Sequence, residues 1–434
     1  MNRIESEDFV YKSFLKAEKY QNYNAKDSSK RRPDLTRQLI RDKSCTPCVL
    51  VTGSKGKGSV AVMISQILQT RYKVGLMTSP HISSFCERFR INGVCVSDDD
   101  FAACMTAVQP DVDAVENGLP LDVCISPMGI QAAFALEYFN TKKTDFNIFE
   151  CGKGARFDDV NNIIHQYSVV NSIFLEHTRE LGDTLEAIAE DKAFIINGEQ
   201  KCVYVAEQTE GVMAVLKKRA VSCNVPMKVY GVDFRAENIM YSSHGMVFDV
   251  IVNGRKYERM SVPLLGEHQA RNCALAMAFC QDVLGTLDEE AVRKALASTD
   301  WPGRMEVLSG EPFVMLDACI NSASCANVKD VLDHLGITRA SVIIGIPDDK
   351  DFLGVAEEMH GYAEKIILTR SQNPHYVFTD QQRTRLLNEG IEAIWTESFD
   401  EALTLAEKGK LPIIILGTTS LVAEVLENRP LVHN

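Results

Sequence analysis

Short apolar runs alternate with segments of helical periodicity along most of this 434-residue chain. Five runs in the first half have the length and the β-branched and aromatic content of buried strands. They are residues 48–52, 74–78, 146–151, 169–175 and 202–206. Apolar residues recur at helical spacing between them, over 59–70, 126–140 and 184–196. This alternation predicts a parallel sheet with helices on both faces.

The pattern changes twice in the second half of the chain. Residues 228–264 are strand-rich, with a hairpin turn expected at Asn253-Gly254, and a helix follows over 268–284. Trp301-Pro302-Gly303-Arg304 then interrupts the pattern as a linker does. The β/α alternation begins again after it, with strands expected at 313–316, 341–346, 365–368, 393–396 and 412–416.

Residues 52–59 read Thr-Gly-Ser-Lys-Gly-Lys-Gly-Ser and stand between an apolar strand and a helical segment. In that context glycines let backbone N–H groups approach phosphate oxygens. Lys57 supplies a positive charge near the terminal phosphates, and the Ser59 hydroxyl is placed to ligate Mg²⁺. The predicted ATP-binding residues of this loop are Gly53, Ser54, Lys55, Gly56, Lys57, Gly58 and Ser59.

The spacing of this loop differs from that of a strict phosphate loop. Gly53 lies only three residues before Gly56, and Gly58 separates Lys57 from Ser59. The alternative interpretation is a glycine-rich turn that touches no ligand. The order of strand, glycines, lysine, hydroxyl and helix favours ATP. We therefore expect an α/β fold with an N-terminal P-loop-type parallel-sheet domain flanked by helices, residues 1–298 including an N-terminal helical segment. A smaller C-terminal Rossmann-like α/β domain is expected at 299–434.

Composition narrows the class of protein. Hydrophobic residues make up 45% and charged residues 24%, as in a globular enzyme, and no apolar run is long enough to cross a membrane. The net charge of −13 argues against nucleic acid as a partner. The N-terminus has no apolar signal core, and 13 scattered cysteines fit a reducing cytoplasm. The Cys45-Thr-Pro-Cys48 spacing has no second pair, so we interpret it as structural.

Further candidate residues follow the loop in the sequence. Glu150 ends an expected strand, where a carboxylate facing a phosphate loop commonly holds Mg²⁺. His177 is expected to end the next strand, Lys192 lies in a helical segment, and Asn272 follows Gly266-Glu267-His268-Gln269. Each has an ordinary explanation as a capping carboxylate, a structural histidine or a solvated lysine. The order in which these four residues follow the glycine loop along the chain favours a shared site.

With these residues the chain resembles the Mur ligase superfamily, in particular the folylpolyglutamate synthase/dihydrofolate synthase group. The resemblance covers nearly the whole chain and is collinear. Its carriers are Gly53–Ser59, Thr78-Ser-Pro-His81, Glu87-Arg-Phe-Arg-Ile-Asn-Gly93, Glu150-Cys-Gly-Lys-Gly-Ala-Arg156, Glu176-His-Thr178, Leu181-Gly-Asp-Thr184, Asp191-Lys-Ala193, His268-Gln269 with Asn272, and Trp301-Pro-Gly-Arg304.

The resemblance implies an ATP-dependent ligase. ATP phosphorylates a substrate carboxylate, and an amine attacks the acyl phosphate to form an amide, with two Mg²⁺ ions neutralising charge. The acid would be a folate or dihydropteroate and the amine L-glutamate. The family is mostly monomeric, so the resemblance also implies a monomer, while net charge and hydropathy imply neither a nucleic-acid nor a membrane partner.

The same resemblance assigns roles to residues of this chain. Lys57, Glu150, His177 and Lys192 would be catalytic. Ser59 and Glu150 would hold one Mg²⁺, and His177 with a carbamylated Lys192 the second. Asn272 and Arg304 would touch ATP phosphates or base and Asp317 the ribose, which adds all three to the ATP-binding set. Ser79, His81 and Arg156 form the expected substrate set, with Ser79 and His81 at the border of the pterin-like acceptor site.

The C-terminal motif departs from the family pattern. The family usually has Asp-Gly-Ala-His-Asn-Pro, whereas residues 317–322 here read Asp-Ala-Cys-Ile-Asn-Ser. Isoleucine at 320 has no hydrogen-bonding group where the family histidine helps to place the amine substrate. Lys153, Ala155 and Glu176 are smaller departures. Two alternatives therefore stay open: a paralogous amide ligase for another acid and amine in specialised metabolism or the cell envelope, and a non-catalytic nucleotide-binding regulator.

Overall fold

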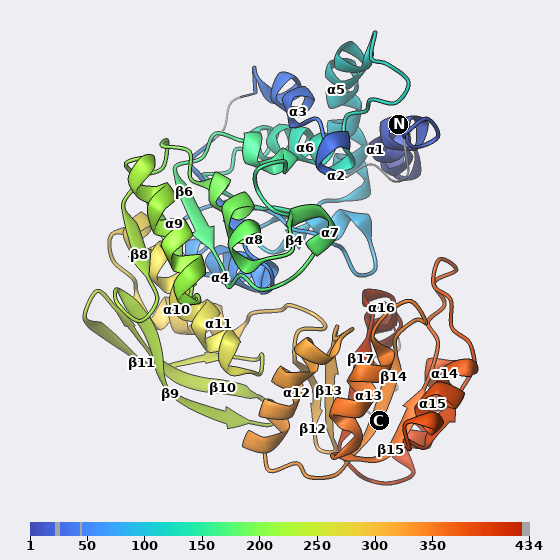
Figure 1. The fold of residues 1–434 in the computed structure, drawn as a ribbon. Coiled ribbons are helices and arrows are strands. Elements are labelled where there is room, and N and C mark those ends of the chain that lie inside the picture. The colour runs from blue at the N-terminus through green and yellow to red at the C-terminus, as the bar shows by residue number, and fades with distance from the viewer. Residues whose placement is uncertain (22–26, 44–45, 428–434) are drawn as a thin grey trace. The chain divides into compact units, whose positions relative to one another are not determined.

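The computed structural model describes residues 1–21, 27–43 and 46–427. They divide into two compact units (Figure 1). The first contains Met1–Ala236, Val250–Tyr257 and Arg271–Ala295, and the second contains the rest of the described chain. The domain limits at 298 and 299 stay a prediction.

The first unit is built on an eight-stranded sheet in the order β4-β3-β2-β5-β1-β6-β7-β8. Its strands are β1 Cys48–Thr52, β2 Val74–Met77, β3 Phe89–Ile91, β4 Val94–Cys95, β5 Phe146–Glu150, β6 Tyr167–Val170, β7 Cys202–Val205 and β8 Met227–Val229. The strands from β2 to β8 in this order are parallel, as expected, while β3 and β4 add an antiparallel edge. Val51 pairs with Glu150, so the glycine loop and Glu150 leave the sheet at the same edge.

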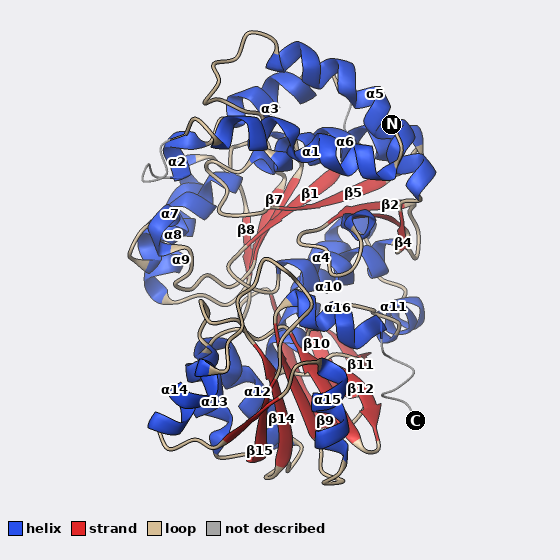
Figure 2. Cartoon of the chain, turned by 90° about the vertical axis from the view of Figure 1, so that its right-hand side faces the viewer, coloured by secondary structure: helices blue, strands red, loops and turns tan. Residues whose placement is uncertain are grey.

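Helices cover both faces of this sheet (Figure 2). They are α1 Arg3–Glu18, α2 Asp27–Lys30, α3 Pro33–Ile40, α4 Lys57–Leu68, α5 Asp98–Glu116, α6 Pro127–Thr141, α7 Thr178–Leu181, α8 Leu185–Lys192, α9 Glu210–Ser222, α10 Glu267–Leu284 and α11 Glu289–Ala297, with short 3₁₀ turns η1 Phe85–Arg88, η2 Asp159–Asn162 and η3 Ala193–Ile195. Side chains on a strand point alternately to opposite faces. Phe149 of β5 accordingly meets Phe139 of α6, with ring centroids 5.8 Å apart, while Phe146 meets Phe279 of α10 at 6.0 Å.

The Phe279 ring is a central contact of the α10 layer. Its centroid lies 5.4 Å from those of both Tyr167 and Tyr204, on two further strands, and the residue is fully buried. Phe279→Ala should leave a cavity under three strands and lower the free energy of unfolding by about 3–5 kcal/mol. Urea unfolding would measure this change. Val221→Ala, at a position that is 82% exposed, is the control and should change it by less than about 0.5 kcal/mol.

A separate three-stranded sheet has the order β11-β10-β9. Its strands are β9 Phe234–Ser242, β10 Gly245–Val252 and β11 Arg255–Val262. Asn253 and Gly254 connect β10 to β11 with φ angles of 49° and 80°. Two successive positive φ values characterise the type I′ hairpin turn, which Asn-Gly favours. The predicted hairpin is therefore confirmed.

The second unit contains a six-stranded sheet in the order β12-β13-β17-β14-β15-β16. Its strands are β12 Glu306–Gly310, β13 Phe313–Asp317, β14 Ala340–Gly345, β15 Ala363–Leu368, β16 Ala393–Trp395 and β17 Ile413–Gly417; its helices are α12 Ser322–His334, α13 Phe352–His360, α14 Gln381–Asn388, α15 Phe399–Glu407 and α16 Thr419–Glu427. All neighbouring strands are parallel except β12 and β13. The expected second, smaller α/β sheet is present.

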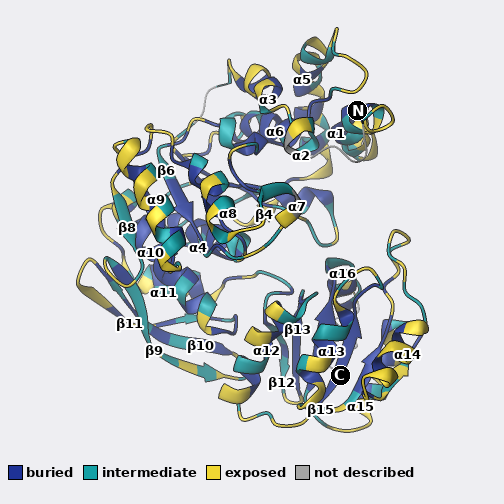
Figure 3. Ribbon diagram, in the orientation of Figure 1, coloured by how far each residue is buried: buried dark blue, intermediate teal, exposed yellow. Residues whose placement is uncertain are grey.

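Buried residues gather in the strands of the two large sheets (Figure 3). Every residue of β1, β5, β13, β14 and β17 is buried. The twelve cysteines within the described ranges are free thiols, and Cys45 lies outside those ranges. Of the helices described, none has both the length and the apolar composition of a membrane span.

Two boundaries were predicted wrongly. The strand expected at 169–175 ends at Val170, and the helix expected at 184–196 ends at Lys192, before a 3₁₀ turn. Both errors change where site residues lie.

Candidate active site

The glycine loop connects β1 to α4 and is in close contact with the segment after β6. Gly53 and Gly56 have φ angles of 146° and 73°, which side chains other than glycine rarely adopt. A Cβ atom on Gly53 would lie 2.8 Å from Cβ of Asn171, and one on Gly56 would lie 2.5 Å from Asn171 Nδ2. Both glycines are therefore required by backbone conformation and by space.

Two lysine side chains converge on one carbonyl of this loop. Lys57 Nζ donates to the Gly53 oxygen at 3.2 Å, and Lys192 Nζ donates to the same oxygen at 2.8 Å. Lys192 is 1% exposed and also pairs with Glu176 at 2.9 Å. Burial, together with the nearby Lys57 charge, lowers the pKa of Lys192. The Gly53 carbonyl thus contacts both the Lys57 ammonium and the Lys192–Glu176 ion pair.

Glu150 brings a carboxylate to the same edge of the sheet. It is 3% exposed, and its Oε2 accepts a hydrogen bond from the Ser79 amide at 2.9 Å. Ser59 is 2% exposed and lies in the first turn of α4, which packs on β1 and β5. The predicted metal ligands Ser59 and Glu150 are therefore oxygen donors held by adjacent elements.

His177 does not end a strand as expected. β6 ends at Val170, and His177 precedes α7 with a φ of 47°. Its Nε2 lies 3.9 Å from Glu176 Oε2, and its side chain is 49% exposed. Partial burial lowers the pKa of His177, which favours the neutral imidazole that a metal requires. Glu176 thus connects His177 with Lys192.

The other loop residues and Asn272 are arranged around this centre. Ser54 Oγ donates to the Phe174 carbonyl at 3.1 Å, while Lys55 is exposed and Gly58 lies in the first turn of α4. Asn272 of α10 accepts a hydrogen bond from Asn171 Nδ2 at 2.9 Å. A Cβ on Gly56 would lie 3.1 Å from Asn272 Nδ2, so Asn272 borders the loop, and its contact with ATP stays a prediction.

The expected substrate residues occupy two places. Ser79 and His81 follow β2, and His81 Nδ1 accepts a hydrogen bond from Arg88 Nε at 2.9 Å. Arg156 lies elsewhere, with its guanidinium 4.7 Å from the Phe194 ring centroid and its backbone N–H directed at Asp191. Its role toward a substrate stays a prediction.

Arg304 and Asp317 belong to the second unit. Arg304 donates to the Gly303 carbonyl at 3.0 Å, and Asp317 Oδ2 accepts from the Met305 amide at 2.8 Å. Ile320 is half-buried in the connection from β13 to α12, whose first turn Asn321 caps. The contacts of Arg304 and Asp317 with ATP stay predictions.

Sequence reasoning gave no role to Asn171, Glu176, Asp191 or Arg88. Asn171 directly follows β6 at the edge where ligands bind in open α/β sheets, and that position is a usable signal. Asp191 accepts hydrogen bonds from the amides of Ala155 and Arg156 at 2.8 and 3.3 Å. Such contacts join segments far apart in sequence and leave no local pattern.

A buried acid lies beside this region. Asp158 is 4% exposed, and burial, with a smaller effect of Asp159, raises its pKa from 3.8 to about 6. The folded state therefore favours the neutral acid. Its contribution to stability is complete below about pH 4 and is lost as the pH rises through about 6.

Asp158→Asn removes this ionisation. The free energy of unfolding of the unmodified protein, relative to that of the variant, should fall by roughly 2 kcal/mol between pH 4 and pH 7. Urea unfolding of both proteins at several pH values measures the difference. A difference that is constant over this range would contradict the ionisation of a buried Asp158.

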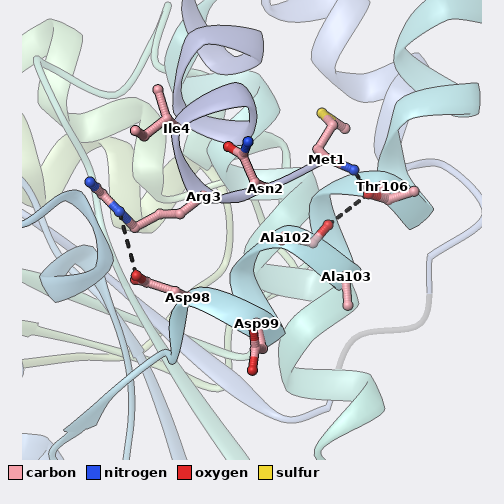
Figure 4. A pocket seen from close by; sticks show the side chains of 9 residues that line it. All are labelled: Met1, Asn2, Arg3, Ile4, Asp98, Asp99, Ala102, Ala103 and Thr106. Carbon is pink, nitrogen blue, oxygen red and sulfur yellow. Dashed lines mark hydrogen bonds and ion pairs between the residues drawn. The ribbon is translucent and has the colours of Figure 1, made fainter.

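One hollow lies away from these residues, between the first turn of α1 and the start of α5 (Figure 4). Ala102 and Ala103 form part of its wall, and Arg3 is directed to Asp98 at 3.6 Å. It contains none of the predicted site residues.

The sequence of this chain is similar to those of known proteins. Residues 122–280 match the Mur ligase middle domain, a range that includes Glu150, His177, Lys192 and Asn272. The dihydrofolate synthase/folylpolyglutamate synthase of Bacillus subtilis is 29% identical over 397 residues, covering 86% of this chain and 88% of that protein. Residues 122–280 of the chain are therefore similar to the middle domain of Mur ligases.

A further relative and a solved structure carry names of the same group. A probable bifunctional folylpolyglutamate synthase/dihydropteroate synthase of Haloferax volcanii is 28% identical over 393 residues; this chain spans 45% of that longer protein. The structure of Mycobacterium tuberculosis folylpolyglutamate synthase complexed with ADP superposes with a TM-score of 0.85 at 24% identity, covering 99% of each chain. That likeness shows a shared fold.

Proposed function

We propose that the protein is an ATP-dependent ligase that adds L-glutamate to a folate or dihydropteroate. The observation that carries this proposal is the convergence of Lys57 and Lys192 on the Gly53 carbonyl, at 3.2 and 2.8 Å. The Lys57 ammonium and the N–H groups of the glycine loop provide a binding site for ATP phosphates, and Lys192 of α8 holds the loop through the Gly53 carbonyl. The relatives named for folate ligation supply the substrate class.

The reaction has two steps. A carboxylate oxygen of the acid attacks the γ-phosphorus of ATP, and ADP leaves with the bond electrons. The amine nitrogen then attacks the acyl carbon, loses a proton and expels phosphate. Lys57 and the loop amides hold and orient the phosphates, and Lys192 keeps the Gly53 carbonyl in place. Burial of Glu150 and Lys192 strengthens their electrostatic effect.

The donors fit Mg²⁺. The Ser59 hydroxyl and the Glu150 carboxylate are hard oxygen ligands, and Mg²⁺ is usually held by one or two protein carboxylates, water and substrate phosphates. Among the described residues no three His, Cys, Asp or Glu side chains gather as a closed metal cage, which suits such an ion. When bound, Mg²⁺ would supply charge neutralisation between the phosphates and the attacking carboxylate.

Lys192 fits a second ion only after modification. An ammonium cannot ligate a cation, whereas the carbamate formed from a neutral amine and CO₂ offers oxygen ligands. Burial lowers the pKa of Lys192 and so increases the neutral fraction that reacts. We propose that carbamylated Lys192, with His177, completes the second position. In the unmodified lysine, the ammonium instead pairs with Glu176 at 2.9 Å.

A paralogous ligase for another acid and amine is the second candidate. Ile320 favours it, because the half-buried isoleucine cannot donate a hydrogen bond to the carboxylate of an amino acid. We also propose a monomeric, cytoplasmic protein. The twelve free thiols in the described ranges suit a reducing compartment.

Phosphate release from ATP and Mg²⁺, with a panel of acids and amines, tests the proposal. The panel begins with dihydropteroate or tetrahydrofolate and glutamate, and Lys57→Ala serves as the inactive control. Turnover that requires both folate and glutamate supports the first candidate. Turnover only with another amine would exclude the folate ligase and support the paralogous ligase. ATP binding without turnover on a broad panel would favour the non-catalytic nucleotide-binding regulator.

A further inference from the structure

Arg88 holds the imidazole of His81 from one side. Arg88 Nε donates to His81 Nδ1, and Arg88 Nη1 donates to Gln131 Oε1, both at 2.9 Å. The guanidinium also lies 5.0 Å from the Phe85 ring centroid, and the His81 ring lies 5.6 Å from the same ring. Arg88 is 9% exposed, so these neighbours fix its position.

This contact determines the tautomer of His81. A guanidinium has only donors, so the hydrogen bond must run from Arg88 to a lone pair on Nδ1. Nδ1 therefore carries no proton, and the neutral ring carries its proton on Nε2. Within the described part of the chain, no residue accepts a hydrogen bond from this Nε2. The N–H group of a half-buried ring is thus available to a ligand.

Charged groups around the pair indicate what that ligand atom is. Glu7 and Tyr11 of α1 and Glu150 of β5 act on Arg88, and Glu87 of η1 acts on His81. The charges of Glu7, Glu87 and Glu150 outweigh the single positive charge of Arg88, so the pair does not form a cationic site for an anion. Burial and Arg88 lower the pKa of His81, with Glu87 opposing, so the ring stays neutral. A neutral donor in this setting suits a neutral acceptor.

We propose that Arg88 is a positioning residue that fixes His81 as an Nε2–H donor to a carbonyl oxygen or aromatic ring nitrogen of the acid substrate. This proposal rests on the proposed ligase function. It adds a specific recognition step. His81 donates a hydrogen bond to a neutral part of the acid, separate from the carboxylate that reacts.

Nitrogen-15 NMR of the imidazoles in the full chain without ligand tests the tautomer, independently of any activity. The chain has nine histidines, and the His81 signals are those that His81→Gln removes. We expect the pattern of the Nε2-protonated ring at neutral pH. In Arg88→Met the tautomers should mix and the ring should titrate at higher pH. Arg90→Met is the matched control, because Arg90 donates to Thr78 at 3.2 Å, and it should leave the His81 signals unchanged.

Kinetics with the acid substrate test the recognition step. Arg88→Lys keeps the charge but cannot reproduce the fork that reaches both His81 and Gln131. Loss of one oriented hydrogen bond should raise KM for the acid by about tenfold, with a smaller change in kcat and none in KM for ATP. Equal effects on both substrates, or an Nδ1-protonated His81 in the unmodified protein, would overturn the proposal. If Arg88→Met fails to fold, the unmodified protein and Arg88→Lys still decide it.

Discussion

Glu150→Gln is expected to reduce phosphate release roughly 10²–10³-fold while the protein stays folded. Glu150 is 3% exposed, and its Oε2 accepts the Ser79 N–H at 2.9 Å. Glutamine has the same shape, and its amide oxygen can accept that hydrogen bond. The substitution therefore removes the negative charge and little else. Phosphate release at saturating ATP, with Mg²⁺ varied, measures the loss and any higher requirement for the metal.

The control for this experiment is a carboxylate of the same unit outside the loop. Glu290 of α11 pairs with Lys294 at 2.6 Å and is 76% exposed. Glu290→Gln should change turnover by less than about threefold, because exposed ion pairs contribute little. Thermal unfolding of both variants would show that the fold is kept. Turnover of Glu150→Gln within threefold of the unmodified protein would refute the role of Glu150 in phosphate and metal binding.

Local sequence signals were sufficient for the centre of the site. The β1 strand, the glycines with positive φ and the start of α4 are properties of neighbouring residues, so residues 48–68 were predicted with small errors. Glu150 could be located because an apolar run ended at it. Parallel pairing then places strand ends at one edge, which is a general rule for such sheets.

The segment 171–174 was predicted wrongly for a reason that lies outside the segment. The backbone N–H of Asn171 still donates to the Thr52 carbonyl of β1 at 2.8 Å. The amide of Ile173 and the amide and carbonyl of Phe174 bond to side chains instead of to a neighbouring strand. Ser54 Oγ donates to the Phe174 carbonyl and accepts from its amide, both at 3.1 Å. Gln208 accepts from the Ile173 amide at 3.0 Å and donates to the Asn171 carbonyl at 3.0 Å. Hydrogen bonds between residues more than 30 positions apart leave no periodic signal.

The Arg156 side chain illustrates a second limit. Sequence resemblance placed it with the substrate residues, and its motif does follow β5 directly. Its guanidinium lies over the Phe194 ring in the turn after α8, and its backbone N–H donates to Asp191 near the end of α8. Side-chain direction is set by tertiary packing, which a motif does not encode.

Lys192→Ala is expected to lower turnover roughly 10²–10³-fold, because two roles converge on this side chain. As an ammonium it holds the Gly53 carbonyl at 2.8 Å and neutralises Glu176 at 2.9 Å. As a carbamate it would contribute oxygen atoms to a metal. Lys294→Ala is the matched control, since Lys294 belongs to an exposed ion pair at 2.6 Å with Glu290 and lies outside the loop.

Chemical rescue separates the two roles, because truncation at a site that is 1% exposed leaves space for a small molecule. Acetate should restore part of the turnover if the carbamate is the active form, and methylammonium should do so if the ammonium is. Depleting CO₂ and bicarbonate should lower the activity of the unmodified protein only in the first case. Turnover of Lys192→Ala within threefold of normal would remove both roles and leave Lys57 alone as the cation of the loop.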